Sequence, residues 1–284
     1  MRIDSHQHFW EYNHQDYGWM GSGMAKLRKD HLPGDLAGLL KNSGIEGTVA
    51  VQARQSLQET AWLLELAEQN NFIKGVVGWV DLRSSAVDSE LELVSSNVKL
   101  KGVRHVLQDE NDDRFMLRED FLKGISRLKK FNLTYDILIF PRHIQYAVEL
   151  VKKFPEQAFV IDHIAKPFIK DGTIKAWQHG MRQLGESENV YCKISGMVTE
   201  ASWNNWTKQD FIPYMESVLE IFGVKRLMFG SDWPVCTLAA EYEEVFEIVA
   251  EFINNLSSDE QANIMGLNAE NFYHLKTQEA SEAH

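Results

Sequence analysis

The sequence has few cysteines, few positive charges and no long hydrophobic run, and each shortage excludes a class of protein. Only Cys192 and Cys236 occur among the 284 residues, so no disulfide framework holds this chain together. Lysine and arginine total 29 against 41 aspartates and glutamates, a net charge of -12, whereas nucleic acids and anionic membranes bind basic surfaces. The hydrophilic start lacks the apolar stretch of a signal peptide or membrane span. We therefore expect a soluble cytoplasmic protein that binds neither nucleic acid nor membrane.

What the sequence does contain is a short apolar run that recurs eight times. With 44% hydrophobic residues, a chain of this length can bury a large core. The runs are rich in valine and isoleucine, which is typical of strands buried on both faces of a parallel sheet. They cover residues 3–8, 47–51, 74–80, 98–103, 133–139, 158–161, 190–194 and 226–229.

Helical patterns separate several of these runs. One begins near Ser56, which we expect to be its N-cap, with Glu59 completing a capping box. Others cover 142–154, 174–186 and 209–222, and three more, at 239–254, 257–265 and 268–275, are expected to close the fold. We predict one domain over residues 1–276 and a disordered tail over 277–284.

Eight strands alternating with helices in fewer than 300 residues predict a (β/α)8 TIM barrel. An open, doubly wound sheet is the alternative. Such a sheet normally has a glycine-rich phosphate-binding turn after its first strand, but this chain has His6-Gln7-His8 there. The barrel is therefore the favoured architecture.

Polar and charged side chains follow the predicted strands, where a barrel carries its reactive groups. They are His6, His8, Gln52, Arg54, Asp81, Arg104, His105, His163, Ser195 and Asp232. Ordinary loops would place mainly serine, asparagine and glycine at such positions. The number of histidines and aspartates therefore indicates an active site at this end of the barrel.

His6 and His8 are two positions apart, so on a strand both imidazoles point to the same side. If the first and last strands are neighbours, Asp232 joins them. Two imidazoles and a carboxylate suit zinc or a similar divalent ion, with His6, His8 and Asp232 as its ligands. Alternatively, without a metal, the imidazoles donate hydrogen bonds to a substrate carbonyl. The residues alone leave both alternatives open.

Asp232 is our candidate for the general base. An aspartate can also cap a helix, but the next helical pattern begins only near Thr237. His163, at the end of the sixth strand, is a second catalytic candidate, although it could equally be a hydrogen-bonded core histidine.

Five further residues are candidates for substrate binding, namely Arg54, Arg104, His105, Gln52 and Trp233. Arginines beside carboxylates bind hydroxyl or anionic groups, but ion pairs within loops are the simpler alternative. Trp10, Trp19, Trp79 and Trp233 lie near strand ends, where they either line a pocket for a sugar-like ligand or pack in the core.

Other catalytic arrangements are missing from the sequence. Ser195 lacks the Gly-X-Ser-X-Gly pattern of a nucleophilic serine. Cys236 is better explained as a small packing residue than as a nucleophile. No phosphate-binding loop and no zinc-finger spacing occurs.

Several of these segments together resemble a known family. Residues 6–10 (HQHFW), 162–167 (DHIAKP) and 229–234 (FGSDWP), supported by 102–105 (GVRH) and 193–196 (KISG), look like the amidohydrolase superfamily. More narrowly they resemble its amidohydrolase 2 branch, which includes lactonases that act on L-fuconolactone and L-rhamnonolactone. The resemblance covers nearly the whole chain in order.

The resemblance implies a (β/α)8 barrel in which His6 and His8 hold a metal or polarise a carbonyl, and Asp232 activates water. It also implies that His163 helps to polarise the carbonyl or completes the metal site. Binuclear members carry a carboxylated lysine or a glutamate at the fourth strand and a histidine at the fifth, and this chain has neither. One zinc ion, or none, is therefore expected.

The activity implied by the resemblance is hydrolysis of a sugar-acid lactone of the L-fucono-, L-rhamnono- or L-galactono-lactone type, by a monomer or small homo-oligomer. Three alternatives remain at this point. They are a metal-dependent decarboxylase of the same superfamily, a barrel that binds a sugar acid without catalysis, and, more weakly, hydrolysis of amides or phosphoesters.

Overall fold

The eight apolar runs form eight parallel strands in the computed structural model, which describes residues 1–275. Each strand pairs with the next along the chain, in the order β1 to β8. The strands are β1 (Ile3–Gln7), β2 (Gly47–Val51), β3 (Ile73–Gly78), β4 (Leu100–His105), β5 (Thr134–Ile137), β6 (Phe159–Ile161), β7 (Val190–Ile194) and β8 (Leu227–Phe229). The order excludes a doubly wound sheet, in which the strand order reverses.

The first and last strands meet through the residues that follow them. Gln7 pairs with Trp233 in a parallel bridge. The His8 N–H donates to the Trp233 carbonyl oxygen at 2.7 Å, and the Asp232 N–H donates to the His6 carbonyl oxygen at 2.8 Å. The predicted (β/α)8 barrel is therefore confirmed, and its closure brings the two ends of the sequence together.

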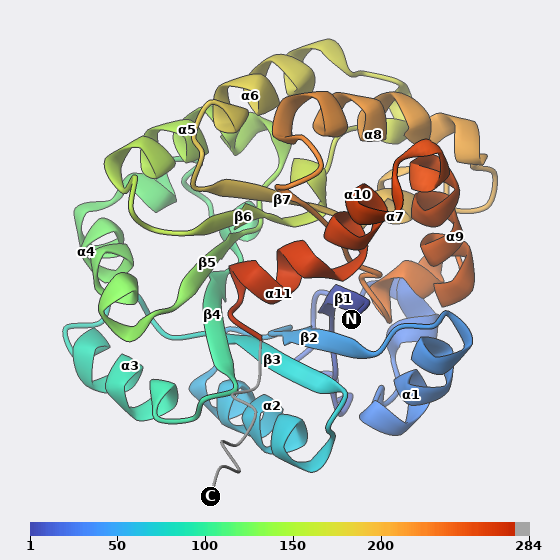
Figure 1. Ribbon diagram of the computed structural model, residues 1–284. Helices are drawn as coiled ribbons and strands as arrows, with labels where there is room; N and C mark the ends of the chain where they lie inside the picture. Colours follow the sequence, from blue (N-terminus) through green and yellow to red (C-terminus); the bar gives the residue numbers. More distant parts are fainter. Residues whose placement is uncertain (276–284) are drawn as a thin grey trace, which may run out of the picture.

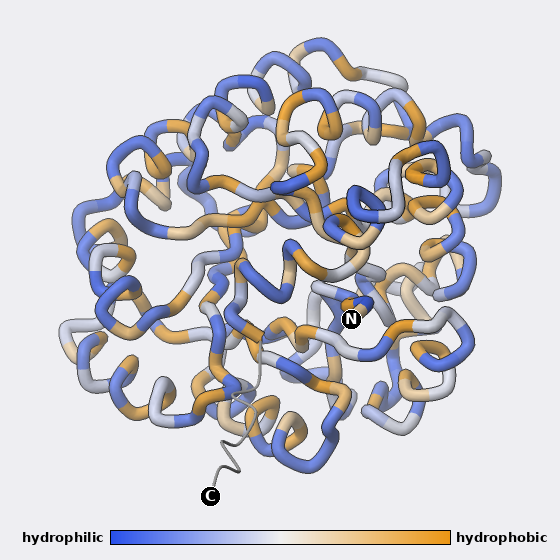
Figure 2. The backbone as a smooth tube through the Cα atoms, viewed as in Figure 1, coloured by the Kyte–Doolittle hydropathy of each residue, from blue (hydrophilic) through white to orange (hydrophobic). Residues whose placement is uncertain are grey.

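Helices surround the ring of strands and cover one of its ends (Figure 1). They are α1 (Pro33–Asn42), α2 (Leu57–Gln69), α3 (Val87–Ser95), α4 (Glu119–Leu128), α5 (Ile144–Lys153), α6 (Lys175–Gly185), α7 (Met197–Glu200), α8 (Lys208–Phe222), α9 (Tyr242–Phe252), α10 (Ser258–Ala262) and α11 (Asn268–Phe272). The hydrophobic segments lie mainly along the strands and the inner faces of the helices, and the hydrophilic segments lie outside (Figure 2).

The end of the barrel at which β1 begins is closed by α11 (Figure 1). Ala269, Phe272 and Tyr273 belong to a buried cluster with Val49 of β2 and Met228 of β8. This apolar plug leaves the other end, where the strands finish, as the open one. The predicted closing role of residues 268–275 is confirmed.

The bounds of several strands differ from the predicted runs by one or a few residues, and two local predictions close to the site are wrong. The fourth strand ends at His105 and not at residue 103, because Arg104 and His105 pair with Asp136 and Ile137 of β5. Pairing with the neighbouring strand decides where a strand ends, and the local sequence pattern does not contain this information.

The N-cap of α2 is confirmed, since the Ser56 hydroxyl accepts from the N–H groups of Gln58 and Glu59. The capping box is wrong. The Glu59 carboxylate does not turn back to Ser56; it accepts from the N–H groups of Ala53 at 3.0 Å and Arg54 at 2.8 Å. Glu59 therefore braces the loop that follows β2.

Within residues 1–275, no helix combines the length and the apolar composition that crossing a bilayer requires. The tail predicted over residues 277–284 lies outside the residues that the structure describes.

Candidate active site

Two histidines at the end of β1 and one aspartate after β8 meet at the open end of the barrel. His6 Nε2 and His8 Nε2 lie 3.2 Å apart. Asp232 Oδ1 lies 3.4 Å from His8 Nε2 and 3.9 Å from His6 Nε2. All three side chains are buried. The structure therefore brings together the three residues that the sequence pattern predicted as metal ligands.

The backbone at Asp232 is turned toward this cluster. Its φ is +58°, a left-handed conformation that is uncommon for residues other than glycine. The short turn that follows, Val235–Leu238, has Pro234 as its N-cap and no capping side chain. Asp232 is therefore not a helix cap, and its strained conformation is the kind found at functional sites.

A hydrogen bond selects the protonation of the His8 ring. His8 Nδ1 lies 2.8 Å from the carbonyl oxygen of Val51, which can only accept, so Nδ1 carries the proton. In the neutral ring this leaves a lone pair on Nε2, which faces His6 and Asp232. A lone pair suits a metal ion, whereas donation to a substrate carbonyl would require a second proton on His8.

The spacing of the three groups suits a zinc ion. Zinc bonds of about 2.0–2.1 Å in tetrahedral geometry place neighbouring ligand atoms roughly 3.3 Å apart. The nitrogen–nitrogen distance of 3.2 Å and the nitrogen–oxygen distances of 3.4 and 3.9 Å are close to this value. His6, His8 and Asp232 therefore form a fitting ligand set for one divalent cation.

His163 enters the cluster from β6 through an unusual turn. Its Nε2 lies 3.8 Å from Asp232 Oδ1, and its ring centroid lies 4.4 Å from that of His6. Its Nδ1 lies 2.9 Å from Ser195 Oγ. Gly196 lets the ring fit, because a Cβ at that glycine would lie 2.6 Å from the ring. Its place beside the carboxylate makes His163 part of the site.

Asp162 contacts the cluster from inside the barrel and orients the His6 ring. Its Oδ1 lies 3.2 Å from His6 Nδ1, and its Oδ2 accepts from Arg104 Nη1 at 2.9 Å. Gln52 in turn accepts from Arg104 Nε at 2.9 Å and Nη2 at 2.7 Å. Arg104, His6 and Asp162 are therefore locked together inside the barrel.

Lys193 of β7 continues this network deeper into the barrel. Its Nζ lies 3.0 Å from Asp162 Oδ1 and 2.6 Å from Asp136 Oδ2, and all three side chains are fully buried. The Tyr273 hydroxyl donates to Asp136 at 2.7 Å. His6, Asp162 and His163 also lie close enough to hold an ion, but arginine and lysine already pair with both Asp162 oxygens. This second group is therefore a charge network and not a second metal site.

The charge states follow from burial and neighbours. Burial lowers the pKa of His6 and of His163 well below the usual value, so both rings are neutral at neutral pH. Burial would raise the pKa of Asp232, but His163, His8 and Lys166 outweigh it and hold that pKa below its usual value. Asp232 is therefore ionised, as a ligand or a general base must be.

A cavity of about 530 Å³ opens over the cluster. His8, Arg104, His163 and Asp232 line it, whereas His6 lies beneath them. Trp10 and Trp19 form part of its wall. A volume of this size accommodates a small ligand such as a sugar derivative.

Four residues predicted to bind substrate do not line this cavity. Arg54 forms an ion pair with Asp16. The His105 ring turns to the outer side of its strand, where Nε2 lies 2.7 Å from Glu110. Gln52 holds Arg104, and Trp233 packs edge-on against Phe9 and His31 in the core. Arg104 alone of the five predicted binding residues reaches the cavity.

Sequence reasoning missed several residues of the site. Asp136, Asp162 and Lys193 hold it from below, and Gln55, Gln108, Asp109, Glu110 and Lys166 line the cavity. Lys193 and Asp136 carried a usable signal, because a charged residue inside an apolar strand is rarely buried without a partner. The other cavity-lining residues come from loops, whose paths no local pattern predicts.

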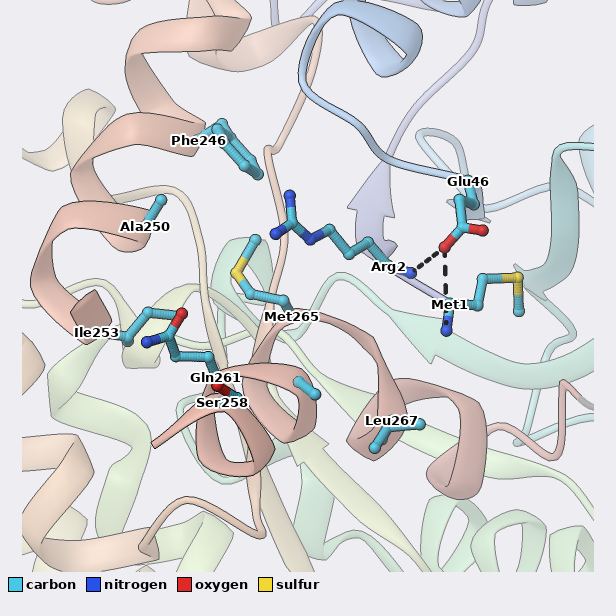
Figure 3. Close-up of a pocket in the computed structure, with 11 residues that line it drawn as sticks. Met1, Arg2, Glu46, Phe246, Ala250, Ile253, Ser258, Gln261, Met265 and Leu267 are labelled. Carbon is cyan, nitrogen blue, oxygen red and sulfur yellow. Dashed lines mark hydrogen bonds and ion pairs between the residues drawn. The ribbon is translucent and has the colours of Figure 1, made fainter. Parts of the chain in front are cut away.

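A second cavity of about 540 Å³ lies at the opposite end of the barrel. Met265, Phe246 and Ile253 form much of its wall, and the Arg2 side chain extends toward Phe246 (Figure 3). The Arg2 N–H donates to Glu46 at 2.8 Å. No imidazole lines this cavity in the described part of the chain, so it lacks the groups that make the other cavity the candidate active site.

Comparison with known proteins agrees with this picture. The amidohydrolase family pattern matches residues 3–275. The chain is 41% identical to an L-fucono-1,5-lactonase of Burkholderia multivorans (97% of this chain, 96% of that protein) and 35% identical to one of Burkholderia ambifaria (96% of each). The crystal structure of a B. multivorans amidohydrolase with bound zinc superposes with a TM-score of 0.93 at 39% identity, covering 97% of this chain and all of that one. This protein, as its sequence motifs indicated, is a member of the amidohydrolase family.

Proposed function

We propose that this protein is a lactonase that opens a sugar-acid lactone of the L-fucono-1,5-lactone type. The observation that carries the proposal is 41% identity to an L-fucono-1,5-lactonase over almost the full length of both chains. The L-rhamnono- and L-galactono-lactone types belong to the same proposal. The site supports it, because an ionised carboxylate and two imidazoles line one cavity, and a third imidazole lies beneath them.

The site residues have separate tasks in this reaction. Asp232 takes a proton from a water molecule, and the water oxygen attacks the lactone carbonyl carbon. Arg104 lines the cavity and carries a positive charge, so it attracts the oxygen on which negative charge develops. His163 contacts the same region from β6. Trp10 and Trp19 shield one side of the cavity from water.

We further propose that His6, His8 and Asp232 hold one zinc ion. Such an ion polarises a carbonyl oxygen and lowers the pKa of water bound to it. The His8 lone pair directed at Asp232 supports this assignment over the metal-free alternative. With Oδ1 of Asp232 facing the imidazoles, we assign proton removal to Oδ2 of the same carboxylate.

The proposed setting is a cytoplasmic enzyme, monomeric or a small homo-oligomer, whose partner is the small-molecule lactone. A panel of sugar lactones tests the function when acid release is followed with a pH indicator, with and without a chelator. We expect turnover above the spontaneous rate for the L-fucono-lactone and a large loss of rate with the chelator.

The same panel separates the alternatives. Opening a lactone releases acid but no carbon dioxide, whereas a decarboxylase would release carbon dioxide from aromatic or unsaturated acids and leave lactones intact. A protein that binds the lactone without accelerating its hydrolysis would be a sensor. Either of these results would overturn the proposed lactonase activity.

A further inference from the structure

Ring opening requires a proton donor, and the cavity offers few candidates. This inference rests on the proposed lactone hydrolysis, in which the ring oxygen leaves as an alkoxide. Arg104 is too weak an acid to supply a proton. The His8 Nε2 that faces the site bears a lone pair, because the ring proton is on Nδ1. Among the cavity-lining residues that the structure describes, Lys166 is the one ammonium group.

The backbone carries Lys166 into the cavity in an unusual way. Four consecutive residues, His163 to Lys166, have φ values between +47° and +58°. A left-handed conformation is energetically unfavourable for each residue other than glycine. It is held by hydrogen bonds from Trp177 Nε1 to the Ile164 oxygen at 2.7 Å and from the Lys166 N–H to the His163 oxygen at 2.8 Å.

This turn has a clear geometric result. It places His163 and Lys166, the first and last residues of the left-handed run, on the wall of the same cavity. An ordinary right-handed turn after β6 would direct these two side chains differently. Strained backbone that the surrounding structure holds in place is typical of functional sites. Here the first and last residues of the strained run both line the cavity.

The side chain of Lys166 is also held in place. Its Nζ lies 3.9 Å from Glu200 Oε1 at the end of α7, and the two side chains are only 18% and 20% exposed. The Nζ lies 5.6 Å from the centre of the Phe140 ring. Lys166 is also near enough to Asp232 to lower the pKa of that carboxyl. The ammonium and the proposed general base therefore line the same cavity.

We propose that Lys166 is a catalytic acid, which protonates the ring oxygen as the lactone opens. Asp232 removes one proton from water, and the carbon–oxygen bond of the tetrahedral intermediate forms. The bond between the carbonyl carbon and the ring oxygen then breaks, and its electron pair takes a proton from Lys166 Nζ. The amine regains a proton from the Asp232 carboxyl group or from solvent. The net reaction adds one water and releases a hydroxy acid, so no oxidant or further reactant is needed.

Two other roles are distinguishable from this one. Lys166 could bind the lactone or product through its charge, in which case its loss would raise KM and an arginine would replace it. Alternatively, Asp232 could return its own proton to the ring oxygen, in which case the loss of Lys166 would leave kcat unchanged. Arginine is the informative substitution, because it keeps the charge and cannot serve as an acid.

The experiment measures kcat and KM for L-fucono-1,5-lactone in the wild type, Lys166→Met, Lys166→Arg and the control Lys170→Met. Lys170 lies four residues further along, is exposed and does not line the cavity. General acids contribute about 100- to 10,000-fold to rate. We expect kcat to fall at least roughly 100-fold in both Lys166 variants, with KM changed only a few-fold. Zinc content and melting temperature, measured on every protein, should match the wild type.

The outcomes separate this inference from the proposed function. An active wild type with normal kcat in Lys166→Met or in Lys166→Arg overturns the catalytic-acid role alone. A loss confined to KM also overturns it and makes Lys166 a binding residue. A wild type that opens no lactone overturns the proposed function, and this inference with it. If Lys166→Met has a lowered melting temperature, the kcat of Lys166→Arg decides whether Lys166 is the catalytic acid.

Discussion

The backbone N–H of Asp232 donates a 2.8 Å hydrogen bond to the carbonyl oxygen of His6, so the last strand of the barrel is tied to the first at the candidate active site. The same closure places Asp232 Oδ1 3.4 Å from the Nε2 atom of His8. The proposed base and ligands are thus positioned by backbone pairing and not by flexible loops. This is the reason to expect that single side chains here can be changed without loss of the fold.

Asp232→Asn should remove the general base and keep the side-chain volume. We expect kcat for the lactone to fall by at least about two to four orders of magnitude, the usual contribution of a base. Steady-state kinetics measures this, and circular dichroism checks the fold. Asp81→Asn is the matched control, because Asp81 also follows a strand but does not line the cavity. An Asp232→Asn enzyme with the wild-type rate would eliminate the proposed base.

His8→Asn should weaken zinc binding, because it removes the imidazole whose Nε2 lone pair faces the site. The hydrogen bond from Nδ1 to the Val51 carbonyl oxygen fixes that lone pair on Nε2. We expect about one zinc per wild-type chain and much less in the variant, as measured by elemental analysis of the purified proteins. Added zinc should raise the melting temperature of the wild type more than that of the variant. The exposed His179 supplies the control, His179→Asn. Equal zinc content in wild type and His8→Asn would show that this residue is not a ligand.

Lys193→Met should destabilise the protein, because it leaves Asp136 and Asp162 buried without their shared cation. Breaking a buried ion pair by removing one partner typically costs about 3–5 kcal/mol, and we expect a loss of this size in the free energy of unfolding. Urea denaturation measures it.

The double variant Lys193→Met with Asp136→Asn is the control for this mechanism. It removes the cation together with one of the two carboxylates, so it should be more stable than Lys193→Met alone. If the second substitution instead lowers stability further, then uncompensated charge is not the cause of the loss.

Glu59 should make stability depend on pH. Burial raises its pKa from 4.5 to about 7, even though the N–H groups of Arg54 and Ala53 donate to it. The folded protein therefore binds this proton more tightly than the unfolded chain does. The stabilising contribution is complete below about pH 4.5 and is lost as the pH rises through about 7.

Comparison with Glu59→Gln isolates this effect, because the amide does not titrate. Relative to the variant, the wild type should lose up to about 3 kcal/mol of unfolding free energy between pH 4.5 and pH 8. Urea denaturation across this range measures the difference. Parallel curves for the two proteins would mean that Glu59 has the same affinity for its proton in the folded and unfolded states.

The sequence was informative about every feature that depends on the pattern of residues along the chain. Eight apolar runs predicted eight strands, and the interval of two between His6 and His8 predicted that both imidazoles face one side. The polar residues after those strands marked the open end. The motifs around His163 and Asp232 identified the family correctly.

The same reasoning could not tell which strand-end residues face the cavity. Arg104 and His105 are neighbours on β4, and one points to the cavity while the other pairs with Glu110. A shift of one residue reverses the two faces of a strand, and the register is set by pairing with β5. Arg54 and Gln52 were misplaced for a related reason, since their partners, Asp16 and Arg104, are distant in sequence.

By itself, then, the sequence determined the number and order of the strands, the kinds of side chain at the candidate site and the family of the protein. These features depend on composition and on spacing along the chain. Only the tertiary structure decided that Lys193, Asp136 and Asp162 support the site from below and that Lys166 reaches the cavity through a left-handed turn. Those arrangements depend on buried charges finding partners on other strands, and residues far apart in the sequence become neighbours only when their strands pair.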